Sequence, residues 1–381
     1  MDFEFSEEQL KLSSDVRKFA REELAPDSAE WDREEKFPWQ GVKRLGEKGY
    51  MGTLFPKSLG GQGRSHVELG IVVEGLARGD MSCAFIVSAQ NGWGQEPVHW
   101  GDDFLREVVK GNEVFAIGST EPGMGSDSTA PMSSANLEGD VYVVRGVKKY
   151  ISFAPVAKYM GCTCRTLPDS EGMKGISYLR IPLDAPGVTV SSISEMGMRA
   201  HTLGRIELSN VRIPRSDLLL PEHKGMYQVF EKWNLMRLLN TINPLGAALQ
   251  SLEETMEYVK SRYAFGRPIA QNQAVQFKIV DDYINIEAAR MLVYRALLML
   301  DRKEPAAKEA AMAKAFGTVV AFHAIDNCMQ NHGAYGYTCE TPIEQRFRDI
   351  RCWQLGNGSV EMMKAIVGTQ ILGRDYQAYR P

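Results

Sequence analysis

Near its C-terminus the chain reads Gln330-Asn331-His332-Gly333-Ala334-Tyr335-Gly336-Tyr337, and a charged segment over residues 342–349 follows it. A second glycine-flanked segment, Gln354-Leu355-Gly356-Asn357-Gly358-Ser359, then leads into an apolar stretch from Met362 to Leu372. Glycine allows the backbone to approach a ligand closely, and the first turn of a helix offers free N–H groups to anions. These segments therefore predict a ligand site made of loops and helix starts, and they contain no metal or hydrolase motif.

Two further motifs occur earlier in the chain. One is Arg262-x-x-Phe265-Gly266-x-x-Ile269-x-x-x-Gln273, and the other is Thr120-Glu121-Pro122-Gly123-x-Gly125-Ser126-Asp127. Together with the C-terminal segments they resemble the flavin-dependent acyl-CoA dehydrogenase family, in the family's order and spacing, over about residues 3–374. Short glycine-containing strings recur by chance, but three of them in register make coincidence a poor explanation.

The residue pattern divides the chain into helical, β-rich and helical parts. Ser6-Glu7-Glu8-Gln9 is a capping box, which predicts a first helix from Ser6 to Leu24. Further N-terminal helices are expected over 38–49, 65–79, 82–91 and 102–110. Short β-rich runs follow at 141–144, 159–164 and 187–190. Long helical segments return over 226–261, 271–301 and 305–331.

We therefore expect an N-terminal α domain (1–113), a middle β domain (114–224) and a C-terminal α-helical bundle domain (225–381). The resemblance implies the same order: a mainly α protein with a central β domain, in which a β-barrel-like middle domain lies between an α-helical N-terminal domain and a C-terminal four-helix bundle. It also implies that FAD is held between the middle domain and the C-terminal helices.

Composition excludes some partners and locations. With 381 residues, a net charge of −4 and a pI near 6.0, the chain gives no electrostatic reason to expect binding to nucleic acid or to an anionic membrane. No apolar run reaches the roughly 20 residues that span a bilayer, and the N-terminus is acidic, so a cytoplasmic protein is expected. The six cysteines lack a paired zinc-site spacing and are expected to be buried reduced thiols.

The resemblance implies which residues contact FAD. Thr120 would contact the flavin pyrimidine ring, Ser126 the phosphate side, Tyr150 a ring face, and Ser152 would hydrogen-bond toward flavin N5, the atom that accepts hydride. Each also has a plain structural interpretation as an ordinary turn or strand residue. The remaining positions implied to contact FAD are Gly125, Arg262, Phe265, Gln273, Gln330, Gly333, Ser359 and Glu361.

The same resemblance implies a homo-oligomer. Arg262 and Phe265 match family residues that reach the ADP part of a neighbouring subunit's FAD, and Gln330 and Gly333 would supply the matching surface. Sharing of this kind requires at least a dimer, and in the family the assembly is commonly a tetramer. Without the surrounding motif, Arg262 would be interpreted as a solvated helix charge.

One departure from the family concerns the catalytic base. Most members carry a Glu just before the Gly-Ser or Gly-Thr pair, where this chain has Asn357. A neutral amide cannot remove an α-proton near pH 7, and only its backbone N–H could serve the thioester carbonyl. Some members place the Glu on an earlier helix instead, but Asn234-Leu235-Met236-Arg237 has Met236 there.

Three interpretations follow. The protein could bind flavin and acyl-CoA without catalysis, or it could reduce an acyl-CoA or run another flavin reaction that needs no carboxylate. In the third, the substrate is a 2-enoyl thioester, which has no α-proton to lose. In such a thioester the acidic proton is on the γ-carbon, because the double bond transmits the effect of the carbonyl. Loss of this proton and of a hydride is a 1,4-elimination, and it extends the conjugated system.

A polar stretch near a predicted helix end favours a ring-shaped substrate. Gln90, Asn91 and Trp93 lie where the family lines its acyl cavity, and Asn234 and Arg237, with Ser126, would contact the pantetheine and acyl entrance. Cyclohex-1-ene-1-carboxyl-CoA dehydrogenases, from anaerobic alicyclic and aromatic acid pathways, are the members whose chemistry fits.

Asn91 is the expected position of the γ-base, so the chain could be a variant in which Asn replaces an Asp base at this position. The alternative interpretation is that Asn91 is a helix C-cap before Gly92. The favoured function is therefore dehydrogenation of an alicyclic enoyl-CoA. By family analogy, electron-transferring flavoprotein is the expected electron acceptor. An ordinary α,β-dehydrogenase or a reductase remains the alternative.

Overall fold

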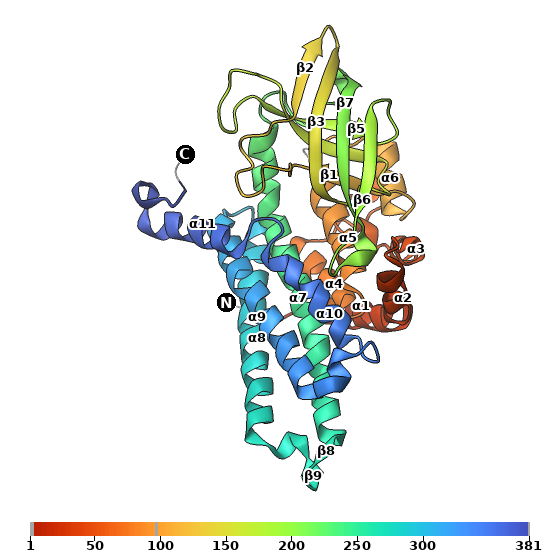
Figure 1. Cartoon of the computed structure of the whole chain (residues 1–381), viewed down its shortest axis with the longest axis vertical. Helices are drawn as coiled ribbons and strands as arrows, with labels where there is room; N and C mark the ends of the chain where they lie inside the picture. The colour runs from red at the N-terminus through yellow and green to blue at the C-terminus, as the bar shows by residue number, and fades with distance from the viewer. Residues whose placement is uncertain (1–3, 96–97, 380–381) are drawn as a thin grey trace.

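The computed structural model describes residues 4–95 and 98–379, and its chain runs through helices, a curled sheet and a second set of helices (Figure 1). The N-terminal helices are α1 (Glu7–Phe19), α2 (Ala25–Glu34), α3 (Trp39–Glu47), α4 (His66–Ala77), α5 (Met81–Trp93) and α6 (Asp102–Val109). The C-terminal helices are α7 (Gly225–Ser261), α8 (Gln273–Asp301), α9 (Ala307–His332), α10 (Ile343–Ile350) and α11 (Val360–Leu372). The predicted architecture, mainly α with a central β region, is confirmed.

The first helix begins as predicted but ends earlier. The Ser6 side chain accepts a hydrogen bond from the Gln9 N–H, and the Gln9 side chain accepts one from the Ser6 N–H, so the capping box is complete. The α-helix ends at Phe19, and a π-helical turn over Ala20–Leu24 connects it to α2. The predicted continuation of one α-helix to Leu24 is therefore wrong, although the chain stays helical.

The middle of the chain forms a seven-stranded sheet with the order β1-β4-β2-β3-β7-β6, and β5 pairs with β4. The strands are β1 (Phe115–Gly118), β2 (Ser134–Glu138), β3 (Val141–Ser152), β4 (Tyr159–Arg165), β5 (Ile176–Pro182), β6 (Val188–Ile193) and β7 (Leu203–Pro214). The long antiparallel pair β3–β7 shifts register twice, between Val144 and Gly146 and between Lys149 and Ile151. Such bulges bend a strand, which is consistent with the curl of the sheet.

The three long helices α7, α8 and α9 pack side by side below the sheet in Figure 1. A short hairpin of β8 (Tyr263–Ala264) and β9 (Arg267–Pro268) closes the end of this bundle that lies farthest from the sheet. Helix α11 packs Val360 and Met363 against the bundle and then projects outward. Its exposed last residues, Ile371 and Leu372, do not contribute to the core.

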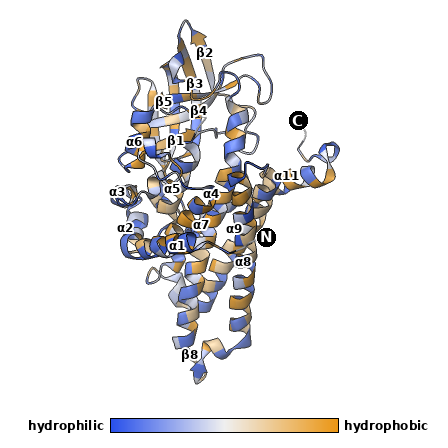
Figure 2. Ribbon diagram, turned by 180° about the vertical axis from the view of Figure 1, so that it is seen from behind, coloured by the Kyte–Doolittle hydropathy of each residue, from blue (hydrophilic) through white to orange (hydrophobic). Residues whose placement is uncertain are grey.

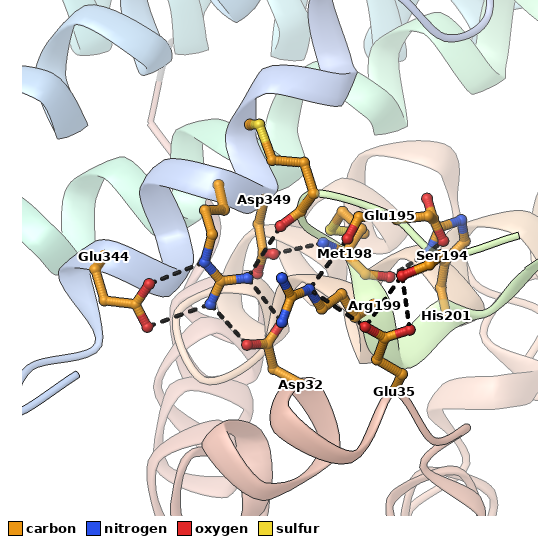
Figure 3. A network of polar contacts seen from close by, with 11 residues as sticks. Asp32, Glu35, Ser194, Glu195, Met198, Arg199, His201, Glu344 and Asp349 are labelled. Atoms are coloured by element: carbon orange, nitrogen blue, oxygen red, sulfur yellow. Dashed lines mark hydrogen bonds and ion pairs between the residues drawn. The ribbon is translucent and has the colours of Figure 1, made fainter. Parts of the chain in front are cut away.

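An ion-pair network joins the three parts of the chain (Figure 3). Arg348 on α10 binds both carboxylate oxygens of Asp32 on α2, at 3.0 and 2.6 Å, and it donates to the Met196 carbonyl at 3.2 Å. Next to it, the buried Asp349 carboxylate accepts a hydrogen bond from the Met198 N–H. This network ties the N-terminal helices and the loop after β6 to the segment that leads to Asn357.

The outer helices α8 and α11 carry exposed apolar side chains. Figure 2 shows hydrophobic residues along both α8 and α11, which lie on the outside of the molecule. Large exposed apolar side chains on these helices are Phe277, Val280, Tyr283, Ile284, Met291, Leu298, Ile371 and Leu372. Within residues 4–95 and 98–379, no helix is both long enough and apolar enough to cross a bilayer.

Candidate active site

The loop after β1 is fixed to the sheet by a buried ion pair. Glu121 accepts hydrogen bonds from the N–H groups of Met132 (2.8 Å) and Ser133 (3.1 Å). Its carboxylate also contacts Lys148 Nζ at 2.7 Å, and this ammonium group donates to the Thr163 carbonyl at 2.7 Å. Because buried charges need pairing and hydrogen bonds, the Glu121–Lys148 pair holds the base of the loop in place.

The outer part of this loop is open to a ligand. Thr120 is half-buried, whereas Gly125 and Ser126 are exposed. A Cβ atom added at Gly123 or Gly125 would meet no atom within 4 Å, so space lies beside the backbone there. The structure thus places Thr120, Gly125 and Ser126 on one accessible loop, as the FAD prediction requires.

The end of strand β3 carries the other two residues predicted near the flavin ring. Tyr150 has a φ of +60° and is half exposed, and the Lys149 ammonium lies 4.8 Å from its ring centroid. Ser152 is opposite Leu203 in the β3–β7 pairing. A bulky residue in the left-handed region is uncommon and is often found at functional sites.

A cavity of about 550 Å³ lies at the far end of the bundle. It is lined by Tyr258, Arg262, Ile269 and residues 330–335. The rings of Tyr258 and His332 stack with centroids 4.1 Å apart, which supports the wall of the cavity. Arg262, predicted to reach a neighbouring subunit's FAD, therefore lines the same cavity as Gln330 and Gly333, which are predicted to supply the matching surface.

Two other predicted contacts lie near this cavity but do not line it. Phe265 is fully exposed in the β8–β9 hairpin and has a φ of +52°. Gln273 is the first residue of α8 and is also exposed. An aromatic residue that is both exposed and in the left-handed region has no role in the core of this chain.

The loop with Asn357 lies between α10 and α11. Asn357 has a φ of +53° and Gly358 one of +90°, so the loop turns sharply at the position of the family's base. The Lys314 ammonium on α9 donates to the carbonyls of Gly356 and Gly358, on either side of Asn357. Ser359 caps α11 by accepting from the Met362 N–H at 3.4 Å, and Glu361 is exposed in its first turn.

Helix α7 presents Asn234 and Arg237 near this loop. Arg237 is 6% exposed, and its Nη1 donates to Asn234 Oδ1 at 2.9 Å. Burial lowers the pKa of Arg237 to about 10. Met236, at the family's alternative base position, is buried, and its sulfur lies close to Gly92 of α5. The structure therefore places no carboxylate at either family position of the base.

The polar residues at the end of α5 are bound within the protein. Asn91 is fully buried; its Nδ2 donates to the carbonyls of Tyr50 (3.2 Å), Met51 (3.1 Å) and Val87 (2.9 Å), and its Oδ1 accepts from the Leu54 N–H at 2.8 Å. These bonds use its whole amide group.

Gln90 and Trp93 are also engaged within the fold. The Gln90 amide exchanges two hydrogen bonds of 3.1 Å with the Phe115 backbone, and the buried Trp93 accepts from the Trp100 indole N–H through its carbonyl. The contacts of Asn91 therefore favour a structural role over the predicted base or an Asp→Asn variant. The C-cap interpretation is wrong in detail, because α5 continues to Trp93.

Two acids, the partly buried Glu195 and the buried Asp349, lie where the loop after β6 meets α10 (Figure 3). Burial and the neighbouring Asp349 and Glu35 raise the pKa of Glu195 to about 8, and burial raises that of Asp349 to about 8. His201 Nδ1 is 3.5 Å from Glu195 Oε1, but burial lowers the pKa of His201 to about 4. The histidine is therefore neutral near pH 7 and does not compensate the acids.

Comparison with known proteins assigns this architecture. The acyl-CoA dehydrogenase N-terminal domain matches residues 6–108, the middle domain residues 116–211 and the C-terminal domain residues 223–372. The chain therefore belongs to the acyl-CoA dehydrogenase family. It is an FAD-dependent oxidoreductase of the class that acts on CH–CH groups, and the open loop at 120–126 fits that cofactor.

The chain is similar to proteins with different stated activities. A probable acyl-CoA dehydrogenase, YngJ of Bacillus subtilis, is 32% identical over 98% of this chain and 100% of the relative. A 3-(aryl)acrylate reductase of Clostridium sporogenes is 31% identical over 97% of this chain and 99% of the relative. The structure of butyryl-CoA dehydrogenase from Megasphaera elsdenii is 28% identical, with a TM-score of 0.92, over 98% of this chain and 100% of that one.

Sequence reasoning missed Lys314 and the two acids Glu195 and Asp349. Lys314 follows Ala310-Ala311-Met312-Ala313, and a single charge in such an apolar run is a signal that could have identified it. Glu195 and Asp349 are far apart in the sequence, so no local pattern shows that they approach each other. No group of His, Cys, Asp and Glu that could hold a metal ion occurs in the described part of the chain.

Substituting Asp for Asn91 tests whether this residue is structural. We expect Asn91→Asp to lower the free energy of unfolding by roughly 3 kcal/mol, because a carboxyl group loses the donors that bind three carbonyls. Chemical denaturation measures the loss, and Asn136→Asp, at an exposed strand position, serves as the matched control. Unchanged stability with a gain of turnover on a cyclic enoyl-CoA would support the base instead.

Replacing Glu195 tests, through the pH dependence of stability, how the Glu195–Asp349 pair affects folding. An acid whose pKa is raised on folding is neutral at low pH and costs stability as pH rises from its unfolded value, near 4.5, to its folded value, about 8. Glu195→Gln removes that cost. The variant should gain about 2–4 kcal/mol over the parent between pH 5 and pH 8.5, measured by denaturation. Glu138→Gln, an exposed strand residue, should show no such trend.

Proposed function

We propose that this chain oxidises or reduces a CoA thioester without using a carboxylate at the family's base position. The observation that carries the proposal is Asn357, which occupies that position in a sharply turned loop and is neutral near pH 7. The buried Met236 leaves the family's second position equally empty. A substrate suited to this site is one whose reaction does not begin with removal of an α-proton by a residue at position 357 or 236.

FAD, when bound, supplies the hydride acceptor or donor, and the residues of this chain hold the reactants. Thr120, Ser126, Tyr150 and Ser152 would hold the flavin part, and the backbone N–H of Asn357 would bind the thioester carbonyl. Asn234 and Arg237 would line the path of the pantetheine and acyl chain. Gln90 and Trp93 are both buried, so they would support the wall of the acyl-binding site without contacting solvent.

The favoured substrate is an alicyclic 2-enoyl thioester of the cyclohex-1-ene-1-carboxyl-CoA type. Its α-carbon is sp² and carries no proton, so Asn in place of Glu causes no loss. Oxidation then removes a γ-proton and a hydride in a 1,4-elimination, as part of anaerobic breakdown of alicyclic or aromatic acids in the cytoplasm. The hydrogen bonds of Asn91 argue against it as the γ-base, so another group or water must take this proton.

Reduction is the second candidate, and one comparison favours it. A relative covering nearly the whole chain is a 3-(aryl)acrylate reductase, which shows that this fold also serves reduction of a conjugated double bond. In that direction the α-carbon receives a proton, which solvent can supply. A carboxylate at position 357 is then not required.

The proposed assembly is a homo-oligomer, in the family's manner a tetramer, with electron-transferring flavoprotein as the electron partner. In Figure 1 the loop that follows β1 lies on the sheet side of the bundle, whereas the β8–β9 hairpin beside the Arg262 cavity closes the opposite end of the bundle, which supports a site shared between two copies. The exposed Phe265 and the apolar surfaces of α8 and α11 offer area for a second copy. A neighbouring subunit would then complete each FAD site.

Flavin absorbance measured anaerobically tests the proposed function. Cyclohex-1-ene-1-carboxyl-CoA should bleach the flavin, whereas saturated straight-chain acyl-CoAs should not, because no base removes their α-proton. Saturated acyl-CoAs should bleach the flavin of Asn357→Glu at a rate at least about 100-fold above that of the parent protein, which is the usual contribution of a general base. Asn357→Gln is the matched control, since it has the length of Glu without the charge.

The remaining outcomes separate the candidates. Reoxidation of the chemically reduced protein by an arylacrylyl-CoA, without bleaching by the cyclic thioester, identifies the reductase. No change with any thioester in either direction identifies a silent flavin-binding protein. Rapid bleaching of the parent protein by saturated acyl-CoAs contradicts the proposal, because an α-base must then exist.

A further inference from the structure

Two cationic side chains are buried beside the Asn357 loop. Lys314 is 1% exposed, and its ammonium group donates to the Gly356 and Gly358 carbonyls. Arg237, one helix away on α7, is close enough to lower the pKa of Lys314, although burial is the larger cause and the two together bring that pKa to about 7. The two helices touch just beyond these residues, where Gly317 of α9 faces the Thr241 methyl group.

Neither cation has an acidic partner within residues 4–95 and 98–379. The hydrogen bonds of Lys314 go to carbonyls, and the side-chain bond of Arg237 goes to the neutral Asn234 amide at 2.9 Å. The buried Arg237 Nε has no hydrogen-bond partner in the described chain. Elsewhere in the protein, buried cations are paired; Lys148 contacts Glu121 at 2.7 Å, for example.

Unpaired buried charge is costly, so this arrangement is expected only where an anion is bound during function. The loop residue between the two bound carbonyls, Asn357, is neutral and cannot supply that anion. The reacting substrate can. When a proton leaves the acyl chain of a thioester, the electron pair of the broken C–H bond remains on the chain and delocalises onto the thioester oxygen, and the proton passes to a base or water.

We propose that Lys314 and Arg237 form a two-cation site that binds the enolate-like negative charge of the reacting thioester, with Lys314 also positioning the 356–358 loop. The inference rests on the proposed function only in that a CoA thioester is the substrate. It holds for both directions of reaction, because hydride addition to an enoyl thioester also places negative charge on the thioester oxygen. The class of ligand is a CoA thioester able to exist as an enolate.

The two residues have different tasks in this site. Lys314 fixes the carbonyls of Gly356 and Gly358, and it thereby sets the direction of the Asn357 N–H; in this respect it is a positioning residue. Arg237 has an unpartnered donor that an anionic oxygen can use. Such fixed charges stabilise developing negative charge most effectively in a buried site, because no solvent must reorganise.

Binding of acetoacetyl-CoA, a thioester with an acidic α-carbon, tests the proposal without turnover. Calorimetry compares its affinity with that of butyryl-CoA, and near-ultraviolet absorbance reports whether the bound ligand is an enolate. The parent protein should prefer acetoacetyl-CoA at least tenfold and hold it as the enolate at pH 6.5, below the pKa of about 7 that Lys314 has in the free protein. Lys314→Met and Arg237→Met should each lose most of that preference, because each lowers the affinity for acetoacetyl-CoA at least tenfold more than the affinity for butyryl-CoA.

Controls keep the result interpretable if a variant folds poorly. Lys314→Arg retains the charge and should retain the enolate, and Lys308→Met removes a half-exposed lysine near the start of the same helix and should change nothing. A parent protein with no preference for acetoacetyl-CoA, or an unchanged preference in both Met variants, overturns the proposal. A preference for glutaryl-CoA over both ligands, lost in the Met variants, would instead assign the two cations to a carboxylate carried by the acyl group.

The test is independent of the proposed reaction. Enolate binding can be lost in the variants even if no thioester bleaches the flavin, in which case the proposed function fails and this inference stands. Conversely, flavin bleaching by the cyclic thioester together with unchanged enolate binding in the variants leaves the function and removes the two-cation site.

Discussion

The ion pair between Arg348 and Asp32 is the contact on which the site depends. It joins α10 to α2 with two short hydrogen bonds, and the adjacent Asp349 holds the Met198 backbone of the middle part of the chain. Residues 351–359 follow directly, so the position of the Asn357 loop is set by a junction of all three parts. A partly buried bidentate pair of this kind is far more specific in geometry than an exposed ion pair.

The same junction contains two acids whose ionised forms are destabilised in the folded protein. The partly buried Glu195 and the buried Asp349 lie near each other with raised pKa values, and the nearby His201 stays neutral. Buried acids of like charge favour a neutral form of at least one of them. Close to the Asn357 loop lie Lys314 and Arg237, which have no acidic partner among the residues that the structure describes. Lys314, which binds the carbonyls on either side of Asn357, thus places a basic group at this loop although the chain as a whole is acidic.

Much of the architecture could be predicted from the sequence, because local chemistry determines it. The capping box at Ser6 fixes where α1 begins, and the glycine-rich motif at 120–127 marks an open loop. The sequence could not show how Asn91 is used, since its partners Tyr50, Met51 and Leu54 belong to another segment. Lys314 was missed for the same reason: its hydrogen bonds reach a loop more than 40 residues away. Sequence motifs identify the residues that contact a ligand. The residues that hold those motifs in place are recognised only from tertiary contacts, which the sequence does not show.

The central claim is that Asn357 leaves this enzyme without an α-proton base. Its most direct measurement is hydrogen–deuterium exchange at the α-carbon of butyryl-CoA in deuterated buffer, followed by mass spectrometry, with the FAD-loaded protein. We expect the α-carbon of butyryl-CoA to exchange no faster than in buffer alone, because neither Asn357 nor Met236 can accept the proton. Rapid exchange catalysed by the parent protein would contradict it and would show that another group of this chain serves as the base.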